Sequence, residues 1–253
     1  MKNILLLLLL QMALISNSSG QVKVIAHRGA WKNTGAPENS IASLKNAIKL
    51  GCAGSEFDVH MSSDSVLFIH HDHGIQGLDI EKTTAKQLLE LKLSNGETMP
   101  TLEEYLLAGI KQKKTRLILE IKPSEINKER SIALTHRVVE TVKLLKAEAV
   151  VDYISFDYDV CKEVLRLAPK AKVAYLNGDL APEALTADHM DGLDYHFKVL
   201  QKNTDWIKEA KERKLTINSW TVNDEAVMDW MISQNVDFIT TNEPELLLKK
   251  LGK

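Results

Sequence analysis

Short apolar, β-branched runs alternate with helix-like segments along nearly the whole chain. Such runs predict strands, because branched side chains fit a pleated, buried surface. Nine are present: VKVIA from 22, SEFDV from 55, VLFIH from 66, RLILEI from 116, VVDYISF from 150, AKVAYL from 171, LDYHF from 193, LTINSWTV from 215 and VDFIT from 236. Helical spacing lies between most of them, at 40–51, 101–112, 129–148, 157–168, 203–214, 223–234 and 243–251. Several of these segments begin with Asn, Thr or Asp, as a helix cap should. We therefore expect βαβ units, a parallel sheet and a single domain.

One connection is too short for this pattern. Only HMSSDS, residues 60–65, separates the runs at 55 and 66, and a parallel crossover needs a dozen residues or more. These two strands should form an antiparallel hairpin, which leaves eight βα units. We expect a TIM (β/α)8 barrel with an extra hairpin strand after the second strand and a small loop insertion from about 73 to 99. An open doubly wound sheet is the alternative.

The first twenty residues have the pattern of a secretory signal peptide. Lys2 precedes an apolar run from Ile4 to Leu10, and Ser18-Ser19-Gly20 forms a small-residue exit. The apolar part is shorter than the roughly 20 residues that span a bilayer, so a transmembrane helix is the less favoured alternative. We expect cleavage before Gln21, a mature domain of residues 21–253 without a membrane span, and a periplasmic location.

The chain has two cysteines, Cys52 and Cys161. An oxidising compartment permits a disulfide between them without requiring one, and two separate buried thiols are favoured. The formal net charge is −2 and the pI is about 6.5, so no basic field would hold a nucleic acid. Any anionic ligand must be bound by a local cluster of charges.

Polar residues gather near the carboxyl ends of the early strands, where TIM barrels place their sites. They are His27 and Arg28, Glu56 and Asp58, His70 and His71, and Glu120 and Lys122. Residues two apart on a strand share a face, so the pairs 56/58 and 120/122 can both point inward. An acidic residue on one strand is more often exposed, but these runs are otherwise apolar and a barrel covers both faces of its strands. Such charges need partners.

Three carboxylates at one end of a barrel would repel one another by about 4 kcal/mol per pair at about 4 Å and an effective dielectric constant near 20. A divalent cation removes this repulsion, and oxygen ligands favour Mg²⁺ or Ca²⁺ over zinc. The carboxylates of Glu56, Asp58 and Glu120 contribute −3, the cation +2, and Arg28 with Lys122 another +2. The resulting +1 suits an anion such as a phosphodiester.

The histidines near these carboxylates suggest acid–base chemistry. Adjacent residues on a strand face opposite sides, so only one of His70 and His71 should reach the pocket, and periodicity does not choose between them. Two pocket histidines would act as general acid and base, each contributing roughly 10²- to 10⁴-fold. His60 shares the parity of Glu56 and Asp58 but lies in the expected turn, where we expect it to be solvated. The remaining histidines are expected to be surface or core residues: His73, His136, His189 and His196.

The motifs of the chain resemble those of the glycerophosphodiester phosphodiesterases, in the order found in that family. They are AHRGA at 26, PENS at 37, GSEFDVHMSSDS at 54, HHD at 70, PTLEEYL at 100, LEIKP at 119, NSWTVND at 218 and ITTNEP at 239. The resemblance covers nearly the whole mature chain and implies a TIM barrel. It also implies residue roles: Glu56, Asp58 and Glu120 as metal ligands; His27 and His71 as the acid–base pair; Arg28 and Lys122 as phosphate ligands; Glu38 beside the metal and glycerol; and Trp220 as an apolar wall for the glycerol.

The resemblance further implies metal-dependent hydrolysis of glycerophosphodiesters to glycerol 3-phosphate and an alcohol, through a cyclic 1,2-phosphate. One departure is Asn242, where the family often has Asp. Two alternatives stand beside this function: action on lysophospholipids or another hydroxyl-bearing phosphodiester, and a protein that binds phosphodiesters without turnover. The presence of both His27 and His71 argues against the second. A metal amidohydrolase barrel would show His-x-His after its first strand, whereas this chain shows His-Arg-Gly.

Overall fold

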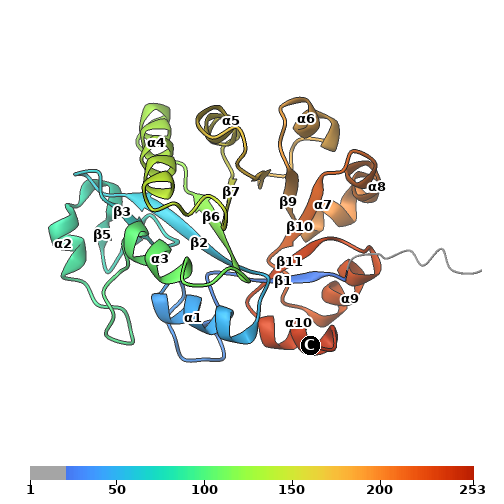
Figure 1. Cartoon of the computed structure of the whole chain (residues 1–253), viewed down its shortest axis with the longest axis horizontal. Helices are drawn as coiled ribbons and strands as arrows, with labels where there is room; N and C mark the ends of the chain where they lie inside the picture. Colours follow the sequence, from blue (N-terminus) through green and yellow to red (C-terminus); the bar gives the residue numbers. More distant parts are fainter. Residues whose placement is uncertain (1–20) are drawn as a thin grey trace, which may run out of the picture.

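The computed structural model describes residues 21–253, and the expected signal peptide lies outside the described residues. All nine predicted strands are present, and eight of them form a closed parallel barrel (Figure 1). In ring order these are β1 (Lys23–Ala26), β2 (Gly54–Met61), β6 (Arg116–Ile121), β7 (Val151–Ser155), β8 (Val173–Tyr175), β9 (Gly192–His196), β10 (Thr216–Trp220) and β11 (Phe238–Thr241). The ring closes where β1 pairs with both β2 and β11. The predicted TIM barrel is therefore confirmed.

The predicted extra hairpin strand is also confirmed. Strand β3 (Leu67–Ile69) pairs antiparallel with β2, with Val59 opposite Ile69, and lies outside the ring. The insertion that follows holds β4 (Gly74–Ile75), β5 (Leu78–Asp79), the 3-10 helix η1 (Ile80–Lys82) and α2 (Ala85–Leu89). It has a small apolar core of its own around Phe68, Ile80 and Leu88. Neither the hairpin of β4 and β5 nor α2 was predicted, since two- to five-residue elements carry little periodicity.

Within residues 21–253, nine further helices surround the barrel. They are α1 (Ile41–Leu50), α3 (Leu102–Gly109), α4 (Lys128–Leu144), α5 (Tyr158–Leu167), α6 (Pro182–Ala187), α7 (Phe197–Lys202), α8 (Thr204–Glu212), α9 (Glu225–Ser233) and α10 (Pro244–Lys250). Side chains cap several N-termini, as the sequence indicated: Thr101 accepts from the Glu104 amide, and Asp224 from those of Ala226 and Val227. Each such cap stabilises its helix by about 1 kcal/mol. The short helices α6 and α7 were not predicted.

Strand alternation separates two apolar layers. Side chains that face outward from the strands, such as Phe57 and Leu119, pack under the helices in the main core. Side chains that face inward form a much smaller core, of which Ile25, Ile118 and Ile154 are members. Burial of each such side chain stabilises the fold by roughly 1.5–3 kcal/mol. The inner layer is thin because many of the inward positions nearer the carboxyl ends of the strands carry polar groups.

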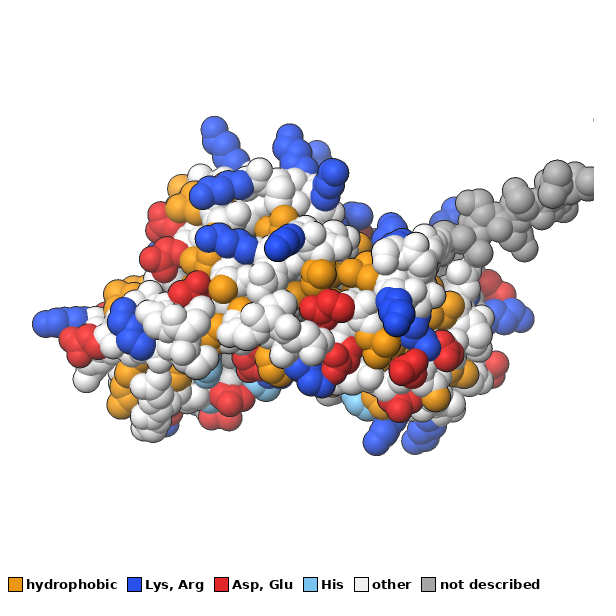
Figure 2. All heavy atoms as spheres, turned by 90° about the horizontal axis from the view of Figure 1, so that it is seen from below, with side chains coloured by type: hydrophobic (Ala, Val, Ile, Leu, Met, Phe, Trp, Pro, Cys, Tyr) orange, Lys and Arg blue, Asp and Glu red, His pale blue; other side chains and the backbone are white. Residues whose placement is uncertain are grey.

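Two smaller predictions concern the cysteines and the membrane. Cys52 and Cys161 are both buried and unpaired, so two separate thiols are confirmed. Among residues 21–253, none of the helices has the length and apolar character needed to cross a bilayer. Figure 2 shows one face of the molecule, on which acidic, basic and apolar side chains are interspersed.

The two ends of the described chain lie close together. Gln21 donates a side-chain hydrogen bond to the Leu251 carbonyl oxygen at 2.8 Å. Just after β1, the backbone amide of His27 donates to the Thr241 carbonyl oxygen at 3.0 Å. The first and last strands therefore meet in a seam that closes the ring.

Candidate active site

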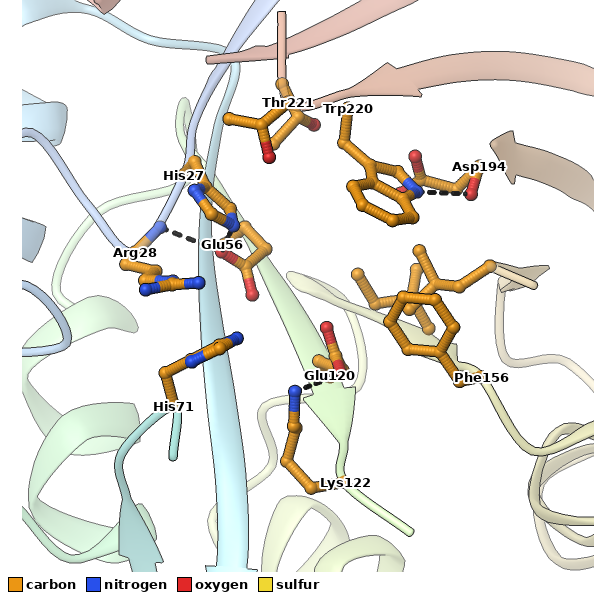
Figure 3. Close-up of a pocket in the computed structure, with 13 residues that line it drawn as sticks. His27, Arg28, Glu56, His71, Glu120, Lys122, Phe156, Asp194, Trp220 and Thr221 are labelled. Atoms are coloured by element: carbon orange, nitrogen blue, oxygen red, sulfur yellow. Dashed lines mark hydrogen bonds and ion pairs between the residues drawn. The ribbon is translucent and has the colours of Figure 1, made fainter. Parts of the chain in front are cut away.

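A pocket opens at the carboxyl ends of the barrel strands (Figure 3). Six residues singled out from the sequence as the charged part of the site line it: His27, Arg28, Glu56, His71, Glu120 and Lys122. Trp220 lines it as well, together with Phe156, Leu176 and Ile154 as an apolar wall. Charged and apolar halves thus face each other across one small cavity.

Three carboxylates converge at the charged side of the pocket. Glu56 and Asp58 point inward from β2, and Glu120 points inward from the neighbouring strand β6, where it pairs in register with Asp58. One oxygen of each carboxylate lies within 4.8 Å of the other two, and all three side chains are buried. The parity argument for an inward-facing acidic cluster is therefore matched by the geometry.

Burial and mutual repulsion disturb the ionisation of this cluster. Burial, with the charges of Asp58 and Glu120, raises the pKa of Glu56 well above its usual range. Burial and the charge of Asp58 raise the pKa of Glu120 to about 7. For Asp58, burial acts upward, but Lys122 and the neighbouring donors bring the pKa below its usual value. A cation would relieve the strain of charging all three groups.

The donor set fits a hard divalent cation. The three side chains offer only oxygen atoms, the ligands preferred by Mg²⁺ and Ca²⁺. Glu56 Oε1 is buried without a hydrogen-bond partner among the described residues, so one oxygen is left for a ligand. Its other oxygen, Oε2, accepts from the Arg28 backbone amide at 2.8 Å, which fixes the orientation of the carboxylate.

The loop after β1 adopts a tight left-handed path to reach this cluster. Arg28 has φ +56° and Gly29 has φ +79°. A Cβ atom on Gly29 would lie 2.4 Å from Ser43 Oγ, so only glycine fits there. The path brings the Arg28 guanidinium to 3.9 Å from Asp58 Oδ2, where its Nη1 donates to Glu38 Oε1 at 2.9 Å. Glu38 itself is not among the residues that line the pocket and contacts it through Arg28.

Asn39 is a site residue that sequence reasoning missed. Its Nδ2 donates to Asp58 Oδ2 at 2.8 Å, and its Oδ1 accepts from the Asp58 backbone amide at 3.2 Å. Asn39 is buried and has φ +56°, a conformation that Asn tolerates better than most residues. The PENS motif contained it, but nothing in the spacing distinguished it from a turn residue.

Lys122 sits just beyond the end of β6, on the face shared with Glu120. Its Nζ lies 2.8 Å from Glu120 Oε1 and 3.4 Å from Asp58 Oδ1. Burial acts to lower the pKa of Lys122, but the nearby carboxylates outweigh it and raise the pKa, so the ammonium stays charged. With Arg28 it supplies the positive charge expected for anion binding.

The two predicted histidines approach the pocket from different elements. Nδ1 of His27 lies 2.7 Å from Asn242 Oδ1, and Nε2 lies 3.8 Å from Glu56 Oε2. Burial and the charge of Arg28 lower the pKa of His27 to about 4. His71 follows β3, and its Nδ1 lies 2.7 Å from Asp72 Oδ1. His71 lines the pocket, whereas the adjacent His70 is not among the lining residues.

The expectation for His60 is wrong. Strand β2 continues to Met61, so His60 lies in the strand and is only 1% exposed rather than solvated in a turn. Its Nε2 lies 3.2 Å from the backbone oxygen of His71, and burial lowers its pKa to about 4. It is a neutral buried group that holds the segment carrying His71.

The apolar wall is built around Trp220. Its ring packs edge-on against Phe156 at 5.4 Å and against His196 at 5.0 Å between centroids. Its Nε1 donates to the Asp194 backbone oxygen at 2.9 Å (Figure 3). Sequence reasoning missed Phe156 and Asp194, although both share inward parity with neighbouring residues of their strands.

The model of the glycerophosphoryl diester phosphodiesterase family matches residues 27–246, the stretch that contains the whole pocket. The chain belongs to the glycerophosphoryl diester phosphodiesterase family. The resemblance in its motifs is thereby confirmed, and so is its class as a phosphodiesterase. Membership of an enzyme family also disfavours the alternative of a binding protein without turnover.

Relatives of this family member match over almost their full length. The glycerophosphodiester phosphodiesterase of Caldanaerobacter subterraneus subsp. tengcongensis is 28% identical over 91% of this chain and 98% of its own. A crystal structure of a glycerophosphodiester phosphodiesterase from Parabacteroides distasonis is 49% identical, with a TM-score of 0.89 over 92% of this chain and 97% of that one. An Oleispira antarctica phosphodiesterase, solved in complex with the product sn-glycerol-3-phosphate, is 26% identical with a TM-score of 0.76 over 91% and 97%.

Proposed function

We propose that this enzyme hydrolyses glycerophosphodiesters to glycerol 3-phosphate and an alcohol, with Mg²⁺ or Ca²⁺ held by Glu56, Asp58 and Glu120. The observation that carries the proposal is the convergence of this buried triad with two cationic side chains and two histidines in one pocket. The product complex of the Oleispira antarctica relative supports the choice of substrate. The small-molecule substrate would enter from the carboxyl end of the barrel.

Charge complementarity supports binding of the phosphate group. Arg28 and Lys122 both lie against the carboxylates and line the pocket, so they can contact phosphate oxygens next to the metal ligands. When bound, a divalent cation would polarise the phosphoryl oxygens and stabilise the negative charge that develops in the reaction. Arg28 and Lys122 add fixed positive charge that needs no reorganisation during the reaction.

His27 is suited to take a proton. The Asn242 side-chain oxygen can only accept a hydrogen bond, so Nδ1 of His27 carries the proton and Nε2 stays free as a base. Its low pKa keeps this base unprotonated at neutral pH. We propose that Nε2 of His27 removes the proton from the glycerol 2-hydroxyl. The hydroxyl oxygen then attacks phosphorus. The bond from phosphorus to the leaving alcohol breaks, and a cyclic 1,2-phosphate forms.

His71 is suited to give a proton to the leaving alcohol. The Asp72 carboxylate holds its Nδ1, and Figure 3 shows the imidazole ring extending into the pocket opposite His27. Water then opens the cyclic phosphate, with the two histidines in exchanged roles, to give glycerol 3-phosphate. Trp220 and Phe156 cover the carbon chain of the glycerol.

Glycerophosphodiesters are favoured over lysophospholipids by the surface around the pocket. The large apolar side chains that residues 21–253 expose are Leu89, Leu107, Ile126 and Leu144. None of them lines the pocket, so none of these exposed side chains offers a contact for an acyl chain inside it.

The test is release of glycerol 3-phosphate from glycerophosphoethanolamine by the purified protein. We expect turnover that a chelator abolishes and that added Mg²⁺ or Ca²⁺ restores. Turnover indifferent to the chelator would remove the metal from the proposal. Faster turnover of lysophosphatidylethanolamine would replace the proposed substrate with the lipid.

We also propose that residues 1–20 direct export and that the mature domain of residues 21–253 works in the periplasm. The sequence pattern of Lys2, a short apolar run and a small-residue exit supports this. N-terminal sequencing of the protein from a periplasmic extract should begin at Gln21. Full-length protein retained in the cytoplasmic fraction would contradict export.

A further inference from the structure

A buried polar network lines the inside of the barrel opposite the carboxylate triad. Asn218 Nδ2 donates to Asp194 Oδ2 at 2.9 Å and to Thr240 Oγ1 at 2.8 Å. The Thr240 hydroxyl in turn donates to Asn218 Oδ1 at 3.2 Å. These residues come from three successive strands, β9, β10 and β11. Both the amide nitrogen and the oxygen of the Asn218 side chain are therefore already used in hydrogen bonds.

Asp194 is the incomplete member of this network. Its side chain is 2% exposed, and Oδ1 has no hydrogen-bond partner among residues 21–253. Burial raises the pKa of Asp194 to about 7, against the hydrogen bond from Asn218. A buried carboxyl oxygen without a partner is costly, so its presence indicates a partner that the protein does not itself supply.

The position of Asp194 indicates what that partner is. In the ring of eight strands β9 lies diametrically opposite β2, so Asp194 faces Glu56 across the pocket that both line. Figure 3 shows it beside the indole of Trp220, on the far side from Arg28 and His71. The phosphate-binding cations therefore lie at one end of the pocket and this carboxyl at the other, with the apolar wall between them.

We propose that Asp194 binds the terminal hydroxyl of the substrate's glycerol group and thereby selects glycerol over other phosphorylated diols. The inference rests on the proposed function. A glycerophosphodiester has two free hydroxyls: the 2-hydroxyl, next to the ester oxygen on phosphorus, and the terminal one, which is farthest from the phosphate. With phosphate beside Arg28 and Lys122 and the carbon chain against Trp220, the terminal hydroxyl reaches the far end of the pocket. A carboxylate there accepts a hydrogen bond from this hydroxyl, and a carboxylic acid donates one to the hydroxyl oxygen.

A second cavity offers a different partner. Asp194 also borders a space toward the amino ends of the strands, between Ile118 and Phe238. A water molecule held there would satisfy Oδ1 without touching the substrate. The two possible partners of Oδ1, the substrate hydroxyl and a water molecule, can be distinguished by substrate preference. A bound water would leave the preference for glycerol substrates independent of Asp194.

The experiment compares two substrates that differ by one hydroxyl. Glycerophosphoethanolamine is paired with the phosphoethanolamine ester of propane-1,2-diol, which keeps the attacking 2-hydroxyl and lacks the terminal one. We expect the wild-type enzyme to prefer the glycerol substrate by roughly 10- to 100-fold in kcat/KM, the range for a hydrogen bond to a charged group. In Asp194→Ala we expect kcat/KM to fall on the glycerol substrate and to stay unchanged on the propanediol substrate, so that the preference is lost. Asp194→Asn, which keeps hydrogen-bonding capacity, should retain much of it.

Asp152→Asn is the matched control. Asp152 is a carboxylate inside the other end of the same barrel, paired with Arg116, and it borders the second cavity but not the active-site pocket. It should leave the preference unchanged. Equal losses of kcat/KM on both substrates in Asp194→Ala would overturn the inference and indicate that the carboxyl binds a water molecule instead. If Asp194→Ala does not fold, the wild-type comparison still decides, because equal kcat/KM values on the two substrates would overturn the inference. No turnover of either substrate would instead contradict the proposed function.

Discussion

Nδ1 of His27 lies 2.7 Å from Oδ1 of Asn242, a residue 215 positions later in the sequence. The contact joins the segment after the first strand to the segment after the last one, and it is the basis on which we assign the ring proton to Nδ1. Here a neutral amide contacts the imidazole, where the resemblance implied an Asp carboxylate. It orients the imidazole and, unlike a carboxylate, places no negative charge beside it. This difference can be measured.

Replacing Asn242 with Asp should move the acid limb of the pH profile. A carboxylate beside Nδ1 favours the imidazolium, so the pKa of His27 rises from about 4. The free base is then lost at a higher pH, and kcat/KM should begin to fall at a higher pH in Asn242→Asp than in wild type. The measurement is kcat/KM for glycerophosphoethanolamine between pH 4 and pH 8. An unmoved acid limb would show that His27 is not the base.

His27→Ala and His71→Ala should each lower kcat by roughly 10²- to 10⁴-fold with little loss of thermal stability. His70→Ala is the control, since His70 adjoins His71 but is not among the pocket residues. It should change kcat far less. If His70→Ala were the damaging substitution, the choice between the neighbours would be wrong.

Asn39→Ala should weaken metal binding without removing a ligand. Asn39 holds both the carboxylate and the backbone amide of Asp58, so its loss frees that side chain to rotate. Loss of such a supporting contact typically weakens metal affinity roughly 10- to 100-fold. Calorimetric titration with Ca²⁺ and with Mg²⁺ measures this directly, independently of turnover. Asp58→Asn should weaken binding further, and an Asn39→Ala protein with wild-type affinity would show that the amide has no such role.

Gly29→Ala should destabilise the fold far more than Gly35→Ala. The two glycines have similar positive φ angles, +79° and +73°, so the backbone strain of an alanine is similar at both. A Cβ at Gly29 would meet Ser43 Oγ at 2.4 Å, whereas at Gly35 nothing lies within 4 Å. We expect Gly35→Ala to cost about 1 kcal/mol and Gly29→Ala at least about twice that. Urea denaturation of both variants measures the difference, and equal losses would contradict the clash.

Asp194→Asn should become more stable relative to wild type as the pH rises. The folded protein holds the Asp194 proton with a pKa of about 7, above the ordinary value of 3.8 in the unfolded chain. The wild-type free energy of unfolding therefore falls as the pH rises from about 4 to about 7, and asparagine does not titrate. The gain of the variant over wild type should reach a few kcal/mol above pH 7, because each pH unit between the two pKa values contributes about 1.4 kcal/mol. Denaturation at several pH values tests this, and a difference independent of pH would contradict it.

Much of the barrel could be predicted from the sequence because strand–helix alternation is a strong and repeated pattern. The one short connection also identified the antiparallel strand β3. The two-residue strands β4 and β5 and the six-residue helices α6 and α7 escaped prediction, because two residues show no alternation and six residues make fewer than two helical turns. The end of β2 was placed too early, and the wrong expectation for His60 followed from that error.

The charged half of the site was predictable for a related reason. Parity within a strand places Glu56 beside Asp58 and Glu120 beside Lys122, and apolar neighbours indicate that these charges face inward. Parity could not choose between His70 and His71, and only the family resemblance did. Asp194 was missed because its run carries a single acidic residue, which by itself indicates nothing. Its unpartnered oxygen becomes visible only when three strands are assembled.

The seam between β1 and β11 also determines when the enzyme can first act. His27 lies on one side of this seam and Asn242 on the other, with a backbone hydrogen bond from His27 to Thr241 between them. The proposed base is therefore oriented only once the last strand has docked against the first. Until then a partly folded chain has its carboxylates and cations but no aligned proton acceptor. Catalytic activity therefore requires the closed ring of strands.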